Sequence, residues 1–179
     1  KIQKTLIEYD HLLKDNEARI IKENLKDLKK IKRKNLIDRL ILDKKKIPQI
    51  RSSLKDIKKF KNPVGQILSK WRRSNKLRIE KVSIPIGVIS VIYESRPNVT
   101  ADVAALCLKS GNCVILKGGS EAFHTNKILA DLFRKALRKN KIDENWVQFI
   151  EKRDRSVVDF ILSKMKNFID VVVPRGGKS

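Results

Sequence analysis

A strand–helix–strand pattern in residues 85–121 constrains the fold more than any other part of the chain. It opens with an apolar run from Ile86 to Ile92, and a second apolar run follows from Cys113 to Leu116. Short runs of this kind are typical of strands that are buried on both faces of a parallel sheet. We therefore predict that these two runs are strands of one parallel sheet.

The segment between the two runs has the features of a helix. From Thr100 onward the apolar side chains recur at helical spacing, with Asn98 or Thr100 expected as the N-cap. Gly111 stands where a helix often ends in a left-handed conformation. The polar segments that follow the two strands then meet at the carboxyl edge of the sheet, where ligands of open α/β sheets bind.

The pattern continues to the end of the chain. We expect a helix from Ser120 to about Lys139, a strand at Val147–Ile150, a helix at Arg155–Lys166 and a strand at Ile169–Val173. Apolar residues of the second helix, Phe160 and Leu162 among them, are available for burial. Alternating strands and helices predict an α/β fold, a Rossmann-like parallel sheet with helices on both faces.

The first part of the chain has a different periodicity. Residues 2–47 have apolar side chains at helical spacing, with breaks expected near Lys14–Glu17 and Lys32–Asn35. Pro48 is expected to open another helix in its first turn, with Phe60 among the inward residues. No catalytic constellation appears here, so residues 1–65 are interpreted as a basic helical segment that packs on the core.

Between these parts, residues 66–84 are expected to form a β-hairpin from the runs Gln66–Trp71 and Leu77–Ser83. Trp71 either anchors an interface or covers a core, and the second role is the commoner one. Residues 85–179 would then be a partial dinucleotide-binding domain.

The charge is strongly positive, at a formal +22. Residues 1–81 carry 26 Lys and Arg against 10 Asp and Glu, so they hold +16 of this excess. A nucleic-acid-binding module is one alternative reading of such a basic segment. The aromatic content of 6% and the lack of a nucleic-acid motif favour a solvated helical face instead.

Several other classes lack the residues that they need. No stretch approaches the ~20 apolar residues of a membrane-spanning helix, and the first residues do not resemble a secretion signal. The spacing of Cys107 and Cys113 does not suit zinc, and His11 and His124 are the only histidines, so no metal site is expected. The cysteines are interpreted as core residues in a reducing cytoplasm. The start without Met and the end soon after a glycine pair suggest a fragment.

The segment from Lys117 to Glu121 has the composition of an anion-binding turn. Gly118 and Gly119 permit close approach to a ligand before a helix N-terminus, where backbone N–H groups favour anions. Ser120 and Glu121 either cap the helix or bond to a ribose. The G-x-G-x-x-G fingerprint and the P-loop motif are both absent, so the common nucleotide-binding motifs do not apply.

The segments PIGVISVIYESRPNVTADVAALCLKSGNCVILKGGSE and IDVVVPRGGKS resemble the signature segments of the gamma-glutamyl phosphate reductases. The lead-in NPVG and the hairpin-like WRRSNKLRIEKVSIPIGV are also similar to that family. These reductases, also called glutamate-5-semialdehyde dehydrogenases, belong to the aldehyde dehydrogenase superfamily and are more than twice as long. The resemblance therefore implies the N-terminal portion of such an enzyme.

The resemblance implies NADPH-dependent reduction of L-glutamyl 5-phosphate to L-glutamate 5-semialdehyde and phosphate, in the second step of proline synthesis. The nucleophilic cysteine of the family would lie beyond Ser179, and neither Cys107 nor Cys113 matches its position. The isolated fragment is therefore expected to be inactive, and the full-length enzyme to be cytoplasmic and homo-oligomeric, acting on a small molecule. Another acyl reductase of the superfamily is the alternative.

The resemblance also implies roles for single residues. Asn98 would donate its side-chain amide to the developing oxyanion, although the Arg-Pro context before it differs from the superfamily's usual one. The cofactor would contact the segment Lys117, Gly118, Gly119, Ser120 and Glu121 at its adenosine end and Gly176 and Gly177 at its pyrophosphate. Arg96 and Arg175 would meet the acyl phosphate or the phosphates of NADPH.

Overall fold

The structure is a computed structural model that describes residues 1–31 and 37–175. In chain order its elements are α1 (Ile2–Asp15), α2 (Glu17–Leu28), α3 (Ile37–Leu40), α4 (Lys46–Lys59), β1 (Ile67–Arg72), β2 (Arg78–Val82), β3 (Val88–Tyr93), α5 (Pro97–Lys109), β4 (Cys113–Gly118), the 3-10 turn η2 (Ser120–Ala122), α6 (Phe123–Lys139), the 3-10 turn η3 (Glu144–Trp146), β5 (Val147–Phe149), α7 (Ser156–Lys164) and β6 (Val171–Arg175).

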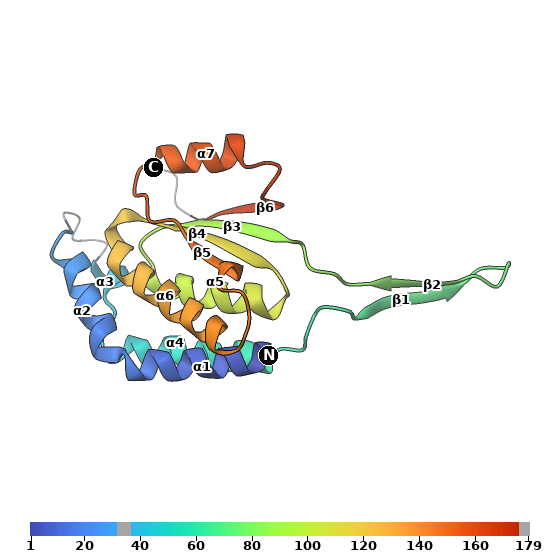
Figure 1. Cartoon of the computed structure of the whole chain (residues 1–179), viewed down its shortest axis with the longest axis horizontal. Helices are drawn as coiled ribbons and strands as arrows, with labels where there is room; N and C mark the ends of the chain where they lie inside the picture. The colour runs from blue at the N-terminus through green and yellow to red at the C-terminus, as the bar shows by residue number, and fades with distance from the viewer. Residues whose placement is uncertain (32–36, 176–179) are drawn as a thin grey trace.

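The central sheet has four parallel strands in the order β5-β4-β3-β6. Helices α5 and α6 cover one face and α7 lies over the other, as Figure 1 shows. This arrangement confirms the predicted fold class. Parallel neighbours need a long crossover connection, and the helices α5, α6 and α7 supply it.

Strand β3 begins two residues later than its apolar run predicts. Ile86 is 57% exposed, and the chain bends at Gly87, where φ is +128°. A Cβ atom at Gly87 would lie 2.1 Å from Oδ2 of Asp170. That same oxygen accepts a hydrogen bond of 2.8 Å from the backbone N–H of Val88. Glycine is therefore required where the chain enters the sheet.

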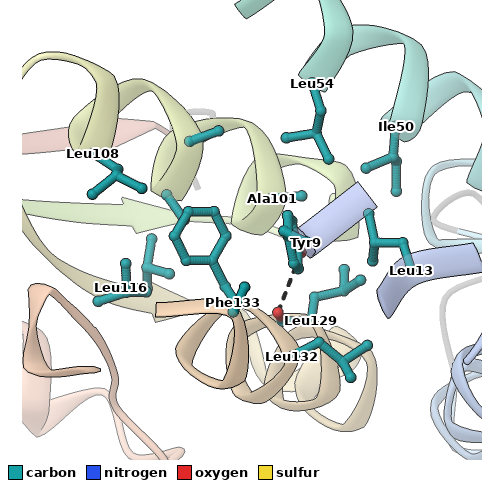
Figure 2. Packing of buried hydrophobic residues seen from close by; sticks show 14 of the residues in the cluster. Tyr9, Leu13, Ile50, Leu54, Ala101, Leu108, Leu116, Leu129, Leu132 and Phe133 are labelled. Carbon is teal, nitrogen blue, oxygen red and sulfur yellow. Dashed lines mark hydrogen bonds between the residues drawn. The ribbon is translucent and has the colours of Figure 1, made fainter. Parts of the chain in front are cut away.

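The core lies between the sheet and the N-terminal helices. Figure 2 shows Tyr9 of α1 in the middle of this cluster, among side chains from α4, α5 and α6. Its ring meets the edge of Phe133 at a centroid distance of 4.6 Å, and its hydroxyl donates a 3.2 Å hydrogen bond to the carbonyl oxygen of Leu129. The ring is fully buried, so α1 packs on α6 through an aromatic contact and a satisfied polar group.

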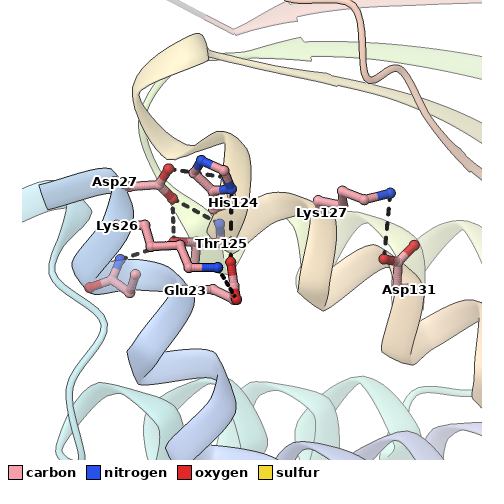
Figure 3. Close-up of polar contacts among 8 residues, drawn as sticks. Glu23, Lys26, Asp27, His124, Thr125, Lys127 and Asp131 are labelled. Atoms are coloured by element: carbon pink, nitrogen blue, oxygen red, sulfur yellow. Dashed lines mark hydrogen bonds and ion pairs between the residues drawn. The ribbon is translucent and has the colours of Figure 1, made fainter. Parts of the chain in front are cut away.

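A second, polar link joins α2 to the start of α6, as Figure 3 shows. The carboxylate of Asp27 accepts hydrogen bonds from the backbone N–H groups of His124 and Thr125, at 3.0 and 2.8 Å, and from the Thr125 hydroxyl at 2.6 Å. Asn24 bonds to both Leu40 and Thr125. Because Ala122 at the N-cap has no polar side chain, a residue of α2 performs the capping of α6.

The N-terminal helices differ from prediction in two places. The break between α1 and α2 occurs at Asn16, as predicted, but residues 41–45 are not helical. Phe60, predicted to face inward, is 55% exposed because α4 ends at Lys59 and Phe60 takes an extended conformation. The second predicted break, Lys32–Asn35, lies outside the described residues.

The hairpin and the last helix expose apolar side chains. Strands β1 and β2 pair antiparallel as predicted and project from the rest of the structure (Figure 1). Trp71 is 47% exposed there, so it does not cover the core. In α7 only Ile161 is buried, while Phe160 and Leu162 are about half exposed. In the part of the chain that is described, no helix is long and apolar enough to cross a membrane.

Candidate functional site

The segments that the sequence predicts as the site begin side by side at one edge of the sheet. Tyr93, the last residue of β3, pairs in register with Gly118 of β4 on one side and with Arg175 of β6 on the other. The segments that follow these strands therefore start from one row of residues. Gly176 and Gly177, predicted to meet the cofactor pyrophosphate, lie outside the described residues.

The segment after β3 becomes helical sooner than predicted. The N-cap of α5 is Arg96, and Pro97 occupies the first helical position, so neither Asn98 nor Thr100 is the N-cap. Proline suits this position because it has no amide hydrogen to leave unpaired and its φ is already helical. As a result Asn98 lies in the first turn of a helix and has a more rigid backbone than a loop residue.

Thr100 has a structural role in place of the predicted cap. Its hydroxyl shares a 2.7 Å hydrogen bond with the Tyr93 hydroxyl and donates at 3.0 Å to Oδ1 of Asn126. The three side chains are buried and connect the end of β3, the first turns of α5 and the first turns of α6. Burial also raises the pKa of Tyr93, so its hydroxyl keeps its proton. These linked hydrogen bonds fix β3, α5 and α6 relative to one another around the site.

Gly118 allows this packing at the edge of the sheet. A Cβ atom there would lie 2.3 Å from Nδ2 of Asn126 and 3.2 Å from the hydroxyl of Tyr93. Gly119 is close to the preceding segment instead, since its Cβ position is 3.5 Å from the backbone nitrogen of Ser95. The Ser95 hydroxyl is also 3.4 Å from Oε2 of Glu121. The segments after β3 and β4 are therefore in direct contact.

Lys117 lies in strand β4 and is buried, although the sequence places it at the start of the loop. Its ammonium group donates a 3.2 Å hydrogen bond to the carbonyl oxygen of Gly118. Burial lowers the pKa of Lys117, and the nearby carboxylates of Glu121 and Asp154 oppose that shift. Ser120 and Glu121 follow in the exposed turn η2. Neither of them forms a side-chain cap there or at the start of α6.

Asn98 faces a cavity of about 320 Å³ on the side of α5 that meets α3 and α4. Its side-chain amide donates to Oδ2 of Asp102 at 3.3 Å, and Oδ1 of Asp102 accepts a 2.7 Å hydrogen bond from Ser53. Arg96 and Lys46 also line the cavity, and the full lining is Asp38, Arg39, Ile41, Leu42, Lys46, Gln49, Ile50, Ser53, Arg96, Pro97, Asn98 and Asp102.

Sequence reasoning missed the contributions of Ser53 and Asp102. The only available signal was the spacing of Asn98 and Asp102, which places residues four apart on one face of a helix. Arg96 lines the cavity, whereas Arg175 is exposed at the end of β6. The structure thus brings Asn98 and Arg96 together and leaves Lys117–Glu121 outside the lining of this cavity.

The cysteines lie away from these groups. Cys107 is buried on α5, where burial raises the pKa of its thiol to about 11, and Cys113 is half-buried at the start of β4. A protonated thiol is a poor nucleophile, which agrees with their interpretation as core residues. Within residues 1–31 and 37–175 no three His, Cys, Asp or Glu side chains gather in a way that could hold a metal ion.

Comparison with known proteins extends this picture. No family model matches the chain. The gamma-glutamyl phosphate reductase of Sulfurihydrogenibium sp. is 46% identical over 178 residues, which are 97% of this chain and 40% of that protein. The crystal structure of gamma-glutamyl phosphate reductase from Thermotoga maritima is 37% identical with a TM-score of 0.95, covering 99% of this chain and 44% of that one.

More distant structures share the fold alone. A probable aldehyde dehydrogenase from Listeria monocytogenes is 12% identical with a TM-score of 0.71, covering 98% of this chain and 37% of that one. An engineered glycolyl-CoA reductase with bound NADP+ is 16% identical with a TM-score of 0.63, covering 98% of this chain and 38% of that one. The chain spans about 40% of the length of the curated relatives that it matches. It is therefore homologous to part of the gamma-glutamyl phosphate reductases and has the fold of the corresponding part of aldehyde dehydrogenases.

Proposed function

We propose that the protein to which this chain belongs reduces L-glutamyl 5-phosphate to L-glutamate 5-semialdehyde, with release of phosphate and with NADPH as the hydride donor. The observation that carries the proposal is the 46% identity, over nearly the whole chain, to a reductase of that name. The same observation favours this function over a nucleic-acid-binding module. We further propose that the reaction serves proline synthesis in the cytoplasm.

Asn98 is proposed to stabilise the oxyanion that develops on the acyl carbonyl. Its amide group has two hydrogens, and Asp102 engages one of them, so the second remains for the substrate. The first turn of α5 holds Asn98 in place, which suits a preorganised donor. The two arginines, Arg96 and Arg175, supply positive charge near this edge for the acyl phosphate or the cofactor phosphates.

The nucleophilic cysteine is proposed to lie in the part of the relatives' length that this chain does not span. Cys107 does not fit the role, because its thiol is buried and its pKa is raised to about 11. We accordingly propose that the isolated chain does not turn over substrate. Attack of the thiolate on the acyl phosphate expels phosphate and leaves a thioester, which the hydride then reduces.

The segment after β4 is proposed to hold the adenosine end of NADPH through Lys117, Gly118, Gly119, Ser120 and Glu121, and Gly176 and Gly177 to approach its pyrophosphate. The bound cofactor supplies hydride to the thioester carbon. Support comes from the contact between this segment and the one that precedes Asn98. A reductase with this fold has been solved with NADP+ bound.

We propose that the chain is divided into three parts, at the boundaries that its sequence indicates. Residues 1–65 form the helical segment, 66–84 the hairpin and 85–179 part of the cofactor-binding domain. The hairpin exposes Trp71 and Leu68, at 47% and 60%, on a projecting arm. Such side chains suit burial in a homo-oligomer.

The test is an assay of the full-length protein in the reverse direction. Purified protein with L-glutamate 5-semialdehyde and NADP+ is expected to produce NADPH, and to do so only when phosphate is present. Asn98→Ala should lower kcat by on the order of 100-fold with little change in the KM for NADP+. A folded full-length protein with no phosphate-dependent reduction of NADP+ would disprove the proposed function.

A further inference from the structure

The cavity beside Asn98 carries charges of both signs, and the proposed reaction gives a role to only one of them, Arg96. Its lining includes the carboxylates of Asp38 and Asp102 and the cations of Arg39, Lys46 and Arg96. We infer that it binds the amino-acid end of the substrate, with Asp102 receiving the α-ammonium group and Arg39 and Lys46 receiving the α-carboxylate. The inference deepens the proposed function and rests on it for the identity of the substrate.

The position of Asn98 sets the direction in which the substrate lies. If its amide meets the acyl carbonyl, the rest of the molecule must extend from that point, and Asn98 is itself part of the cavity wall. Asp102 is one helical turn further along α5, and Arg39 and Lys46 come from α3 and α4 across the cavity. The volume of about 320 Å³ is at the lower end of the range for small-molecule sites.

The carboxylate of Asp102 is held in a fixed orientation and can bind a cation. Its two oxygens accept hydrogen bonds from Ser53 and Asn98, both neutral donors, which fix the orientation of the carboxylate. Within residues 1–31 and 37–175 no Lys or Arg pairs with it. A half-buried carboxylate that is held by neutral groups alone gains most from a ligand with an ammonium group.

The opposite wall is suited to a carboxylate. Lys46 donates to the backbone carbonyl oxygen of Asp38 at 2.5 Å, which holds its ammonium group at the cavity. Arg39 has no ion pair within the described residues, and its guanidinium group can bind a carboxylate through two parallel hydrogen bonds. The two walls therefore match a zwitterion, with one charge of each sign.

A phosphate group fits this cavity less well than an amino acid does. Asp102 would repel it, and a phosphate offers no cationic donor for that carboxylate. Arg96 is the N-cap of α5, two positions before Asn98, and both residues line the cavity. We therefore assign Asp102, Arg39 and Lys46 to the amino-acid end of the substrate and leave Arg96, at the start of α5, for its phosphate.

The binding test uses calorimetry on the full-length protein with three small probes. L-glutamate carries both α-groups, glutarate lacks the ammonium group, and 4-aminobutyrate lacks the α-carboxylate. L-glutamate is expected to bind in the millimolar range and the other two at least about tenfold more weakly. Asp102→Asn removes the charge, keeps one acceptor oxygen for Asn98 and presents an NH2 group that can donate to the Ser53 hydroxyl, and it should weaken L-glutamate binding about tenfold. Asp56→Asn, at an exposed position of α4, is the matched control and should have no effect.

The activity test uses the same variants in the reverse assay. Asp102→Asn and Arg39→Gln should raise the KM for the semialdehyde about tenfold and leave the KM for phosphate and NADP+ unchanged. If the wild-type enzyme is active but glutarate binds as well as L-glutamate, or Asp102→Asn leaves the KM unaltered, the inference is wrong and the proposed function stands. If L-glutamate binds in an Asp102-dependent manner without any reductase activity, the amino-acid site stands and the proposed function fails. A protein with neither property contradicts both.

Discussion

Replacement of Asp27 by alanine should destabilise the structure more than any change at an exposed carboxylate. Asp27 is 3% exposed and accepts three hydrogen bonds from the first turn of α6 (Figure 3). The positive end of the helix dipole also favours a carboxylate at this position. Its removal leaves the N–H of Thr125 and the N–H of His124 without an acceptor in a largely buried place.

The expected loss of unfolding free energy is about 3–5 kcal/mol. A local N-cap contributes about 0.5–2 kcal/mol, and each hydrogen bond to a charged group contributes about 1.5–3 kcal/mol. The three bonds share one carboxylate, so their contributions do not simply add. Asp27→Asn keeps one acceptor oxygen and should cost about half as much. The exposed control Asp56→Asn, which loses only a surface pair with Lys59, should cost no more than about 0.5 kcal/mol.

Urea unfolding of the three variants, followed by circular dichroism, measures these differences at an unchanged slope. The essential result is that the loss of unfolding free energy is largest for Asp27→Ala, smaller for Asp27→Asn and smallest for the control Asp56→Asn. A loss below about 1 kcal/mol for Asp27→Ala would refute the reasoning, because it would mean that the N-terminus of α6 is equally well satisfied by water. A loss in Asp27→Asn equal to that in Asp27→Ala would show that the charge matters and the hydrogen-bond geometry does not.

Three further predictions concern Cys107 in α5 and Lys117 and Gly118 in β4. Cys107, with its pKa of about 11, should react with iodoacetamide at pH 8 on the order of 100-fold more slowly in the folded chain than in the unfolded one, because the usual thiol pKa is about 8.5; equal rates would contradict its burial. Gly118→Ala should cost about 1–3 kcal/mol in urea unfolding, since the new methyl group would lie 2.3 Å from Nδ2 of Asn126; the exposed Ser120→Ala is its control. The pKa of Lys117 is lowered by burial, so the unfolded chain binds more protons and stability should rise with pH between that lowered pKa and the ordinary value of 10.5. Lys117→Met should remove this part of the pH dependence, and an identical pH profile would refute it.

The order of the elements could be predicted because its signals are local. The strand at Cys113 begins where its apolar run begins, since burial on both faces requires several consecutive apolar residues, and the short edge strand at Val147 also begins where predicted. The hairpin was also evident from its alternation. The predicted start of β3 and the predicted burial of Phe60 were wrong. The backbone bends at Gly87 within the apolar run, and α4 ends at Lys59, just before Phe60.

The candidate site was predicted in part. The side-by-side start of the segments after β3 and β4 follows from strand order, and Arg96 and Asn98 both line one cavity. The start of α5 was misplaced although Pro97 marked it, since proline at a first helical position is itself a local signal. Lys117 proved to be a buried strand residue, because β4 runs to Gly118 rather than ending at Leu116.

The sequence by itself determined a parallel α/β sheet, the positions of its glycine-rich turns and the similarity to a reductase family, because these depend on residues that are close together in the chain. Only the tertiary structure decided which polar side chains from distant helices bond to one another or cap a helix. Asp27 and Thr125 are 98 positions apart, and Ser53 and Asp102 are 49 apart. No periodicity relates such residues, since they meet only when the N-terminal helices pack against α5 and α6. That packing places the start of α5 beside α3 and α4, and residues of these three helices line a cavity with charged walls.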